Sequence, residues 1–205
     1  METIEKSIPI LNETPMETRK FHPVKFVVWL LMIGSGMLFM AFTSALIVSR
    51  ADGVKNNAWL EYDIPMSFTV STVIVLVTSI FIHLAYIQIK KDNRSSALLL
   101  MSLTMVGGIA FILSQIMGYQ ALVDAGIYFS NQEAKDIAGS FFYVITGAHL
   151  VHILLGLAIL LYTFIQLIRK KISASKSIMI YVATFYWHFL GFLWIYLFLL
   201  LNLTR

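Results

Sequence analysis

The sequence contains no cysteine among its 205 residues, which excludes disulfide bonds, metal sites ligated by cysteine and a cysteine nucleophile. Charged residues are also scarce, at 13% of the chain, and Asp, Glu, Lys and Arg are absent from the interior of every long apolar run. Proton pumps and ion-coupled transporters usually carry their ion on an acid or a lysine inside the membrane. The lack of such residues, and of helices broken by glycine and proline, argues against an autonomous pump or a small transporter.

Hydrophobic side chains make up 59% of the chain, which is more than a soluble domain of this length can bury. Five apolar runs are each long enough to cross a bilayer core about 30 Å thick, which takes about 20 helical residues. The runs are continuous rather than alternating, so they indicate helices and not barrel strands. The sequence therefore predicts an all-α integral membrane bundle of five transmembrane helices, at 26–48, 64–89, 97–123, 137–168 and 178–203.

The first 24 residues are polar and carry charges of both signs. A signal peptide would begin its apolar core earlier, and a transit peptide would be poor in acidic residues. We therefore expect a polar N-terminal tail at 1–24 without a cleaved signal. One five-helix transmembrane domain at 25–205 is expected to follow it.

The basic residues divide unequally between the two ends of the predicted helices. Eleven of the 15 Lys and Arg residues lie in the tail and in the second and fourth connections: Lys6, Arg19, Lys20, Lys25, Lys90, Lys91, Arg94, Arg169, Lys170, Lys171 and Lys176. The other four are Arg50, Lys55, Lys135 and Arg205. By the positive-inside rule the N-terminus is cytoplasmic and the C-terminus lies outside. Because these loops explain the net charge of +4, we expect no nucleic-acid partner.

The ionisable side chains within the apolar runs are four histidines: His83, His149, His152 and His188. His149 and His152 are three residues apart, which places them on one face of a helix. Two interpretations remain open at this point. The imidazoles hydrogen-bond to neighbouring helices, or His149 or His152 faces His188 across a b-type heme.

The fourth run carries a denser signature, GSFFYVITGAHLVHILLG at 139–156. Its matching positions are Ser140, Phe141, Phe142, Thr146, Gly147, His149, His152 and Gly156. This stretch resembles the signature helix of subunit III of the heme–copper oxidases, the terminal oxidases of aerobic respiration.

Two further runs extend the resemblance. Trp187, His188, Phe189 and Trp194 match the family's Trp-His-Phe triplet and the tryptophan that follows it, with Gly191 where the family commonly has an acid. In the third run, Gln115 and Tyr119 resemble a glutamine followed by an aromatic residue near the outer membrane face. The candidate site residues are therefore Thr146, His149, His152, Trp187, His188, Trp194, Gln115 and Tyr119. We expect them to form a structural polar cluster, with His188 at the depth of the two histidines of the preceding helix.

The first run contains the most consequential departure from the family. Ser35 and Phe39 match a Ser-Glu-x-x-Phe stretch, but Gly36 stands where many members carry a membrane-buried glutamate. No role of that carboxylate therefore carries over to this chain. Gly34 and Gly36 are expected to allow another helix to approach closely.

The resemblance implies a non-catalytic subunit III of a proton-pumping oxidase, cytochrome c oxidase, that supports assembly and sustained turnover of subunit I. Many family members have seven helices, and this chain resembles their five-helix bundle alone. The chain is expected to be part of an enzyme without carrying a catalytic residue, metal or redox cofactor of its own. A bound phospholipid is its one expected ligand.

The implied partners are oxidase subunits I and II, which hold the hemes and copper, together with membrane lipids. We expect cytochrome c to be the electron donor, with quinol as the alternative, in the bacterial cytoplasmic membrane. A membrane b-type cytochrome that uses the mid-span histidines is the rival function.

Overall fold

Five long helices account for almost all of the chain that the computed structural model describes, which is residues 23–56, 59, 62–129 and 137–204. They are α1 (Pro23–Lys55), α2 (Met66–Lys90), α3 (Arg94–Asp124), α4 (Ile137–Ile168) and α5 (Ile178–Thr204). All five are long and apolar enough to cross a membrane, which confirms the predicted fold class. Of the predicted tail at 1–24, residues 1–22 lie outside the described residues, and Pro23 and Val24 begin α1.

Local sequence explains where several helices begin. Pro23 opens α1 and Pro65 immediately precedes α2, positions where proline's missing N–H leaves no helical hydrogen bond unmade. Asn93 caps α3, because its side-chain oxygen accepts a hydrogen bond from the N–H of Ser96 at 3.3 Å. Only residues 91–93 connect α2 to α3.

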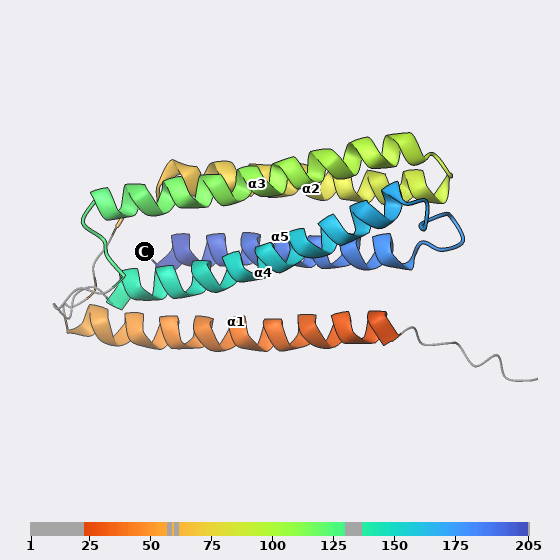
Figure 1. Ribbon diagram of the computed structural model, residues 1–205. Helices are drawn as coiled ribbons and strands as arrows, with labels where there is room; N and C mark the ends of the chain where they lie inside the picture. The colour runs from red at the N-terminus through yellow and green to blue at the C-terminus, as the bar shows by residue number, and fades with distance from the viewer. Residues whose placement is uncertain (1–22, 57–58, 60–61, 130–136, 205) are drawn as a thin grey trace, which may run out of the picture.

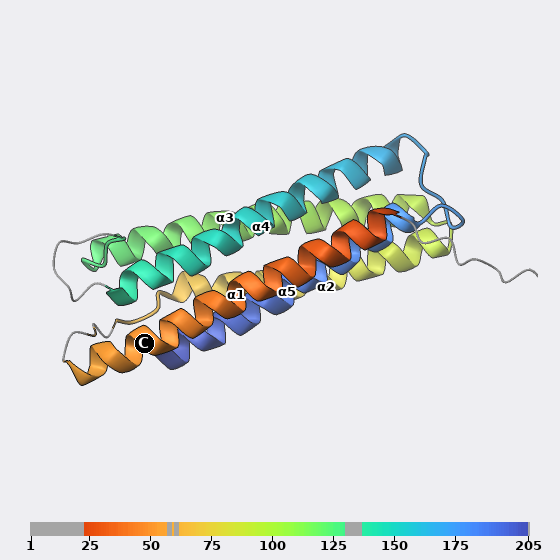
Figure 2. The same ribbon diagram turned by 90° about the horizontal axis from the view of Figure 1, so that it is seen from below.

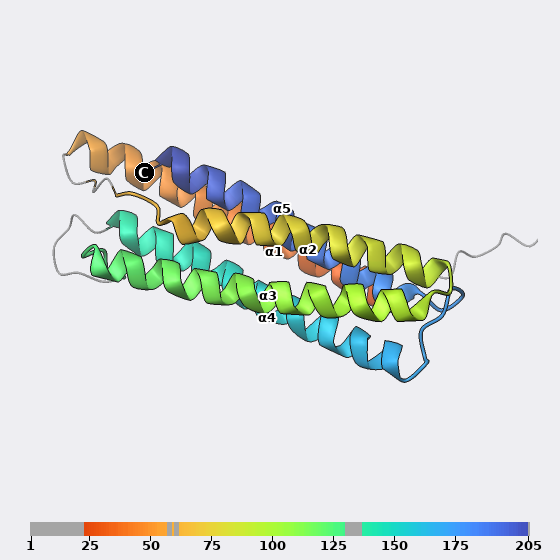
Figure 3. The same ribbon diagram turned by 90° about the horizontal axis from the view of Figure 1, so that it is seen from above.

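The helices run alternately up and down, so the start of α1 and the C-terminus lie at opposite ends of the bundle (Figure 1). The α2–α3 and α4–α5 connections are at the same end as the start of α1. Figure 2 shows α1 lying along α5, and Figure 3 shows α2 and α3 side by side. Helix α5 packs against α1, α2 and α4, and it is the most buried helix: 50% of its most apolar stretch is buried, against 22–28% in the others.

Small residues set the spacing of α3, α4 and α5. A Cβ atom added to Gly108 would lie 2.7 Å from Leu157 and 2.9 Å from Trp187, and one added to Gly156 would lie 2.6 Å from Leu190. These two glycines therefore allow close helix packing. Gly34 and Gly36 differ, because a Cβ at either position meets no described atom within 4 Å, so the close approach expected there does not occur within the described bundle.

The two connections at the basic end are tied to one another. The guanidinium of Arg94 donates to the carbonyl oxygens of Leu167 and Ile168, the last two residues of α4. The carboxylate of Asp92 accepts from the N–H of Ala174 at 3.1 Å. Arg94 thereby satisfies carbonyl groups that a helix end leaves without partners, and it fixes the end of α4 against α3.

Candidate functional site

His149 is the most enclosed polar side chain of the signature. It is completely buried, and its ring centroid lies 5.2 Å from that of Trp194, 6.1 Å from Phe111 and 6.3 Å from Phe39. Neither ring nitrogen has a hydrogen-bond partner in the described part of the chain. Aromatic rings from α1, α3 and α5 therefore surround this imidazole.

His152 shares one neighbour with His149 but faces α1. Its ring centroid is 5.4 Å from that of Phe39, its Nδ1 is 2.8 Å from the carbonyl oxygen of Ala148, and its Nε2 is 3.0 Å from the Ser35 hydroxyl. A carbonyl only accepts, so a neutral imidazole carries its proton on Nδ1. Nε2 then competes with the carbonyl oxygen of Leu31, 2.7 Å from the Ser35 hydroxyl, for the single proton of that hydroxyl. The hydrogen bond between Ser35 and His152 joins α4 to α1.

Three other polar contacts join the remaining signature residues to α2. The indole N–H of Trp187 donates to the Thr78 hydroxyl at 3.2 Å, and that of Trp194 donates to the Thr72 hydroxyl at 2.9 Å. The Gln115 amide, on α3, donates to the hydroxyl of Ser71 at 2.8 Å. Thr78 was not predicted as a site residue from the sequence, although it lies two helical turns after Ser71 on the same face of α2.

Thr146 and Tyr119 lie beside this core rather than at its centre. The buried hydroxyl of Thr146 donates to the carbonyl of Phe142 in its own helix at 2.6 Å. The ring of Tyr119 packs against Phe68 and Tyr143, with centroids 6.0 Å and 5.6 Å apart. Both residues thus contribute to packing near the end of α3.

His188 does not join the histidines of α4. Its ring lies beside that of His83 on α2, with centroids 5.6 Å apart, on the outer face between α2 and α5. Trp187 and His188 are consecutive and point about 100° apart around the helix, so the indole enters the bundle and the imidazole leaves it. The expected juxtaposition of His188 with His149 or His152 is therefore not what the structure has.

Replacing His152 with leucine is expected to weaken the bundle modestly, because it removes the hydrogen bond between α4 and α1. The loss should be about 0.6 to 2 kcal/mol, the range for one interhelical hydrogen bond in a membrane, measured as thermal stability in detergent. Ser35→Ala removes the same bond from its other side and should have a similar effect, with little added in the double variant. If neither single variant changed the thermal stability, this hydrogen bond would not be what holds α4 to α1.

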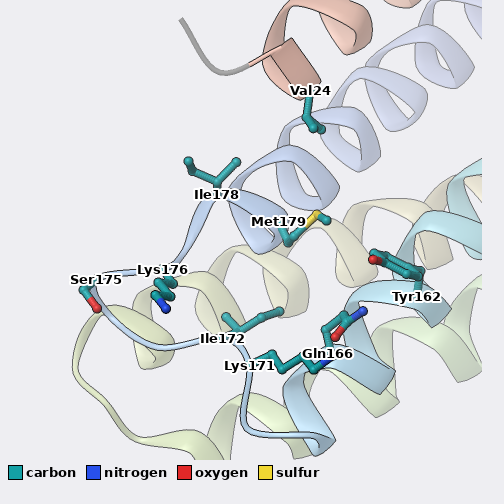
Figure 4. Close-up of a pocket in the computed structure, with 9 residues that line it drawn as sticks. All are labelled: Val24, Tyr162, Gln166, Lys171, Ile172, Ser175, Lys176, Ile178 and Met179. Atoms are coloured by element: carbon teal, nitrogen blue, oxygen red, sulfur yellow. The ribbon is translucent and has the colours of Figure 1, made fainter. Parts of the chain in front are cut away.

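A cavity of about 640 Å³ opens at the basic end, between the start of α1, the end of α4 and the start of α5 (Figure 4). Its polar lining comes from Tyr162, Gln166, Lys171, Ser175 and Lys176. The buried Gln166 Oε1 has no hydrogen-bond partner among the described residues. A second, apolar groove of about 350 Å³ shares part of this lining and continues along the bundle past Val28 and Ala158, among others. Within the described chain, no group of three or more His, Asp or Glu side chains is placed to hold a metal ion.

These features define an integral membrane protein whose signature residues are used for contacts between helices. Residues 19–203 match the model of the family described as cytochrome c oxidase subunit III, and the chain belongs to this family. The resemblance read from the sequence is thus confirmed. It places the chain among the subunits of a heme–copper oxidase, an oxidoreductase complex of the membrane.

Relatives of bacterial and animal origin align with different shares of the chain. Cytochrome c oxidase subunit 3 of Corynebacterium diphtheriae is 27% identical over 173 residues, 82% of this chain and 80% of that protein. The subunit 3 of Alkalihalophilus pseudofirmus is 28% identical over 174 residues, covering 83% and 81%. That of the ostrich, Struthio camelus, is 29% identical over 129 residues, 63% of this chain but only 47% of the relative.

Proposed function

We propose that this chain is a non-catalytic subunit of a proton-pumping terminal oxidase and that it supports the assembly and sustained turnover of subunit I, which reduces dioxygen to water. One observation carries the proposal: four of the eight candidate site residues are engaged in hydrogen bonds between helices. Trp187, Trp194, Gln115 and His152 each make a hydrogen bond to another helix. Groups used in this way support a structural role.

The same geometry favours a chain without a redox centre, whose hemes and copper belong to subunits I and II. A b-type heme between α4 and α5 would need His149 or His152 to face His188 at matched depth. His149 is instead enclosed by Trp194 and Phe111, and His188 lies beside His83. These contacts weigh against the cytochrome alternative.

Cytochrome c is the proposed electron donor to the complex, since the family and its bacterial relatives bear that name. A quinol oxidase is the alternative within the same family. We further propose that the protein resides in the cytoplasmic membrane of a bacterium, as two of the relatives are bacterial proteins.

A phospholipid is the ligand proposed for the cavity at the basic end. The ammonium groups of Lys171 and Lys176 suit a lipid phosphate, and the Gln166 carbonyl oxygen lacks a donor that a headgroup hydroxyl or amine would supply. An acyl chain would follow the adjoining apolar groove past Val28 and Ala158. This cavity lies within the five-helix bundle and needs no further helices.

The proposed orientation has the basic end in the cytoplasm. A reporter fused after Arg205 is expected to be active only outside the cytoplasm, and one fused at Lys91 only inside it. The physical reason is the concentration of Lys and Arg at the end that holds the α2–α3 and α4–α5 connections. The reverse pattern of reporter activity would overturn this orientation.

Affinity purification of the tagged chain from native membranes tests the proposed function. Large heme-bearing partners should be recovered in amounts equal to the chain, in a fraction that consumes oxygen. Recovery of the chain without any heme protein, under conditions that preserve other respiratory complexes, would contradict the proposal.

A further inference from the structure

The outer face between α2 and α5 holds two imidazoles that the bundle does not use. His83 is exposed and His188 is half-buried, and their rings lie 5.6 Å apart. His83 is seven residues before Lys90, the end of α2, so it lies about 10 Å inside that end at 1.5 Å per residue. Serine and threonine in a helix can satisfy their hydroxyl groups by bonding to their own helix. The two imidazoles do not: no hydrogen bond joins either of them to the rest of the described chain.

The two histidines lie between a surface groove and a smaller cavity. The groove, of about 540 Å³, is lined by Leu76, Ser79, Ile80, Leu84 and the two imidazoles. The cavity, of about 130 Å³, is lined by the same imidazoles together with Tyr86, Tyr181, Thr184 and Phe185. Thr184 is only 5% exposed, and its hydroxyl has no hydrogen-bond partner among the described residues. The two imidazoles and the Thr184 hydroxyl thus meet at this one place, without a hydrogen bond to the rest of the described chain.

The flank of the groove has the form of a helix-packing surface. Leu76, Ile80 and Leu84 are exposed and follow one another at intervals of four residues, which makes a ridge along α2 of the kind that fits between the ridges of a second helix. Polar side chains that face lipid are costly, and interhelical hydrogen bonds are a common way to satisfy them. The ridge and the two imidazoles together suit a second helix that carries a polar side chain facing them.

We propose that this groove is the docking surface for a transmembrane helix of a partner oxidase subunit, which brings a hydroxyl, amide or carboxyl side chain to His83 and His188. The inference rests on the proposed function, because it requires a partner within the membrane. The inference specifies which face of the chain the partner covers, and which polar side chains of the partner recognise that face.

Photo-crosslinking in the intact complex tests which molecule covers the groove. The chain with a benzophenone amino acid at Leu84 should give an adduct with another subunit. The same probe at Val106 of α3, also exposed, serves as the matched control and should give mainly lipid adducts. Adducts at Leu84 with lipid or quinone alone would overturn the inference, because the groove would then face the bilayer or hold a small molecule.

Substitution of the imidazoles gives a second and independent readout. His83→Leu and His188→Leu should each lower recovery of the partner by about three- to fifteen-fold, while the isolated chain keeps its thermal stability. His83→Gln should restore part of the recovery, because its amide still forms hydrogen bonds. Full recovery with the double leucine variant would overturn the inference alone. Failure of any heme-bearing partner to accompany the unaltered chain would overturn the proposed function and this inference with it.

Discussion

An oxidase assembled without this chain is expected to begin oxygen consumption at nearly its normal rate and then to lose activity much sooner than the complete complex. The first part follows from what the chain lacks. The interiors of its apolar runs contain no acid or lysine that could relay protons. Removing the chain should therefore leave the chemistry of subunit I in place.

The early decay follows from the area that the chain covers. Its exposed apolar surface includes Phe26, Trp29 and Met37 on α1, and a helical face of this kind is suited to packing on another subunit. Without this chain, subunit I loses the surface that packs against it. We expect this loss to loosen subunit I and to lower the yield of assembled complex. Oxygen-electrode traces at matched heme content measure both the starting rate and the time course. Immediate and complete loss of activity at full heme content would mean that the chain carries an essential role in catalysis or electron entry.

Trp187→Ala is expected to have the largest effect of any single substitution on the stability of the bundle, about 3 to 5 kcal/mol by analogy with buried aromatic residues elsewhere. The side chain is almost completely buried. Its indole donates to Thr78 on α2 and closes over the positions of Gly108 on α3 and Gly156 on α4. Removing it leaves a cavity where four helices meet. The Thr78 hydroxyl, which still donates to the carbonyl of Val75 at 3.0 Å, loses the indole donor.

Phe192→Ala is the matched control, since Phe192 lies on the same helix but is 73% exposed. It should change the stability of the isolated chain by no more than about 0.5 kcal/mol. Trp187→Phe keeps most of the volume and loses the hydrogen bond, so its loss should fall between the two. Thermal unfolding of the three variants in the same detergent, monitored by size-exclusion chromatography, ranks their stabilities. Equal stability for Trp187→Ala and Phe192→Ala would show that Trp187 does not make the largest contribution to the stability of the bundle.

The helices were predictable because the membrane imposes a simple rule on the sequence. An apolar run of sufficient length has to be a helix, so the start of α4 at Ile137 and of α5 at Ile178 followed from hydropathy alone. The extra turns of α1, which continue to Lys55, did not follow. That segment carries Arg50 and Asp52, and hydropathy does not distinguish a polar helix end from a loop.

The arrangement of the polar residues was harder to predict, because it depends on which helices are neighbours. Periodicity places His149 and His152 near one another, and both contact Phe39. It does not say that α2 lies alongside α5, which decides that Trp187 meets Thr78 and that His188 meets His83. Adjacent residues on α5 therefore have unrelated roles, one in the core and one on the surface.

The absorption spectrum of the purified chain tests the central claim most directly, namely that this subunit works without a redox centre of its own. The tagged chain, separated from its partners in detergent, should show no Soret band and no stoichiometric copper, while the complex recovered before separation should show the heme spectrum of an oxidase. A stoichiometric b-type heme spectrum in the isolated chain, lost on His149→Ala or His188→Ala, would contradict the account and make the protein a cytochrome.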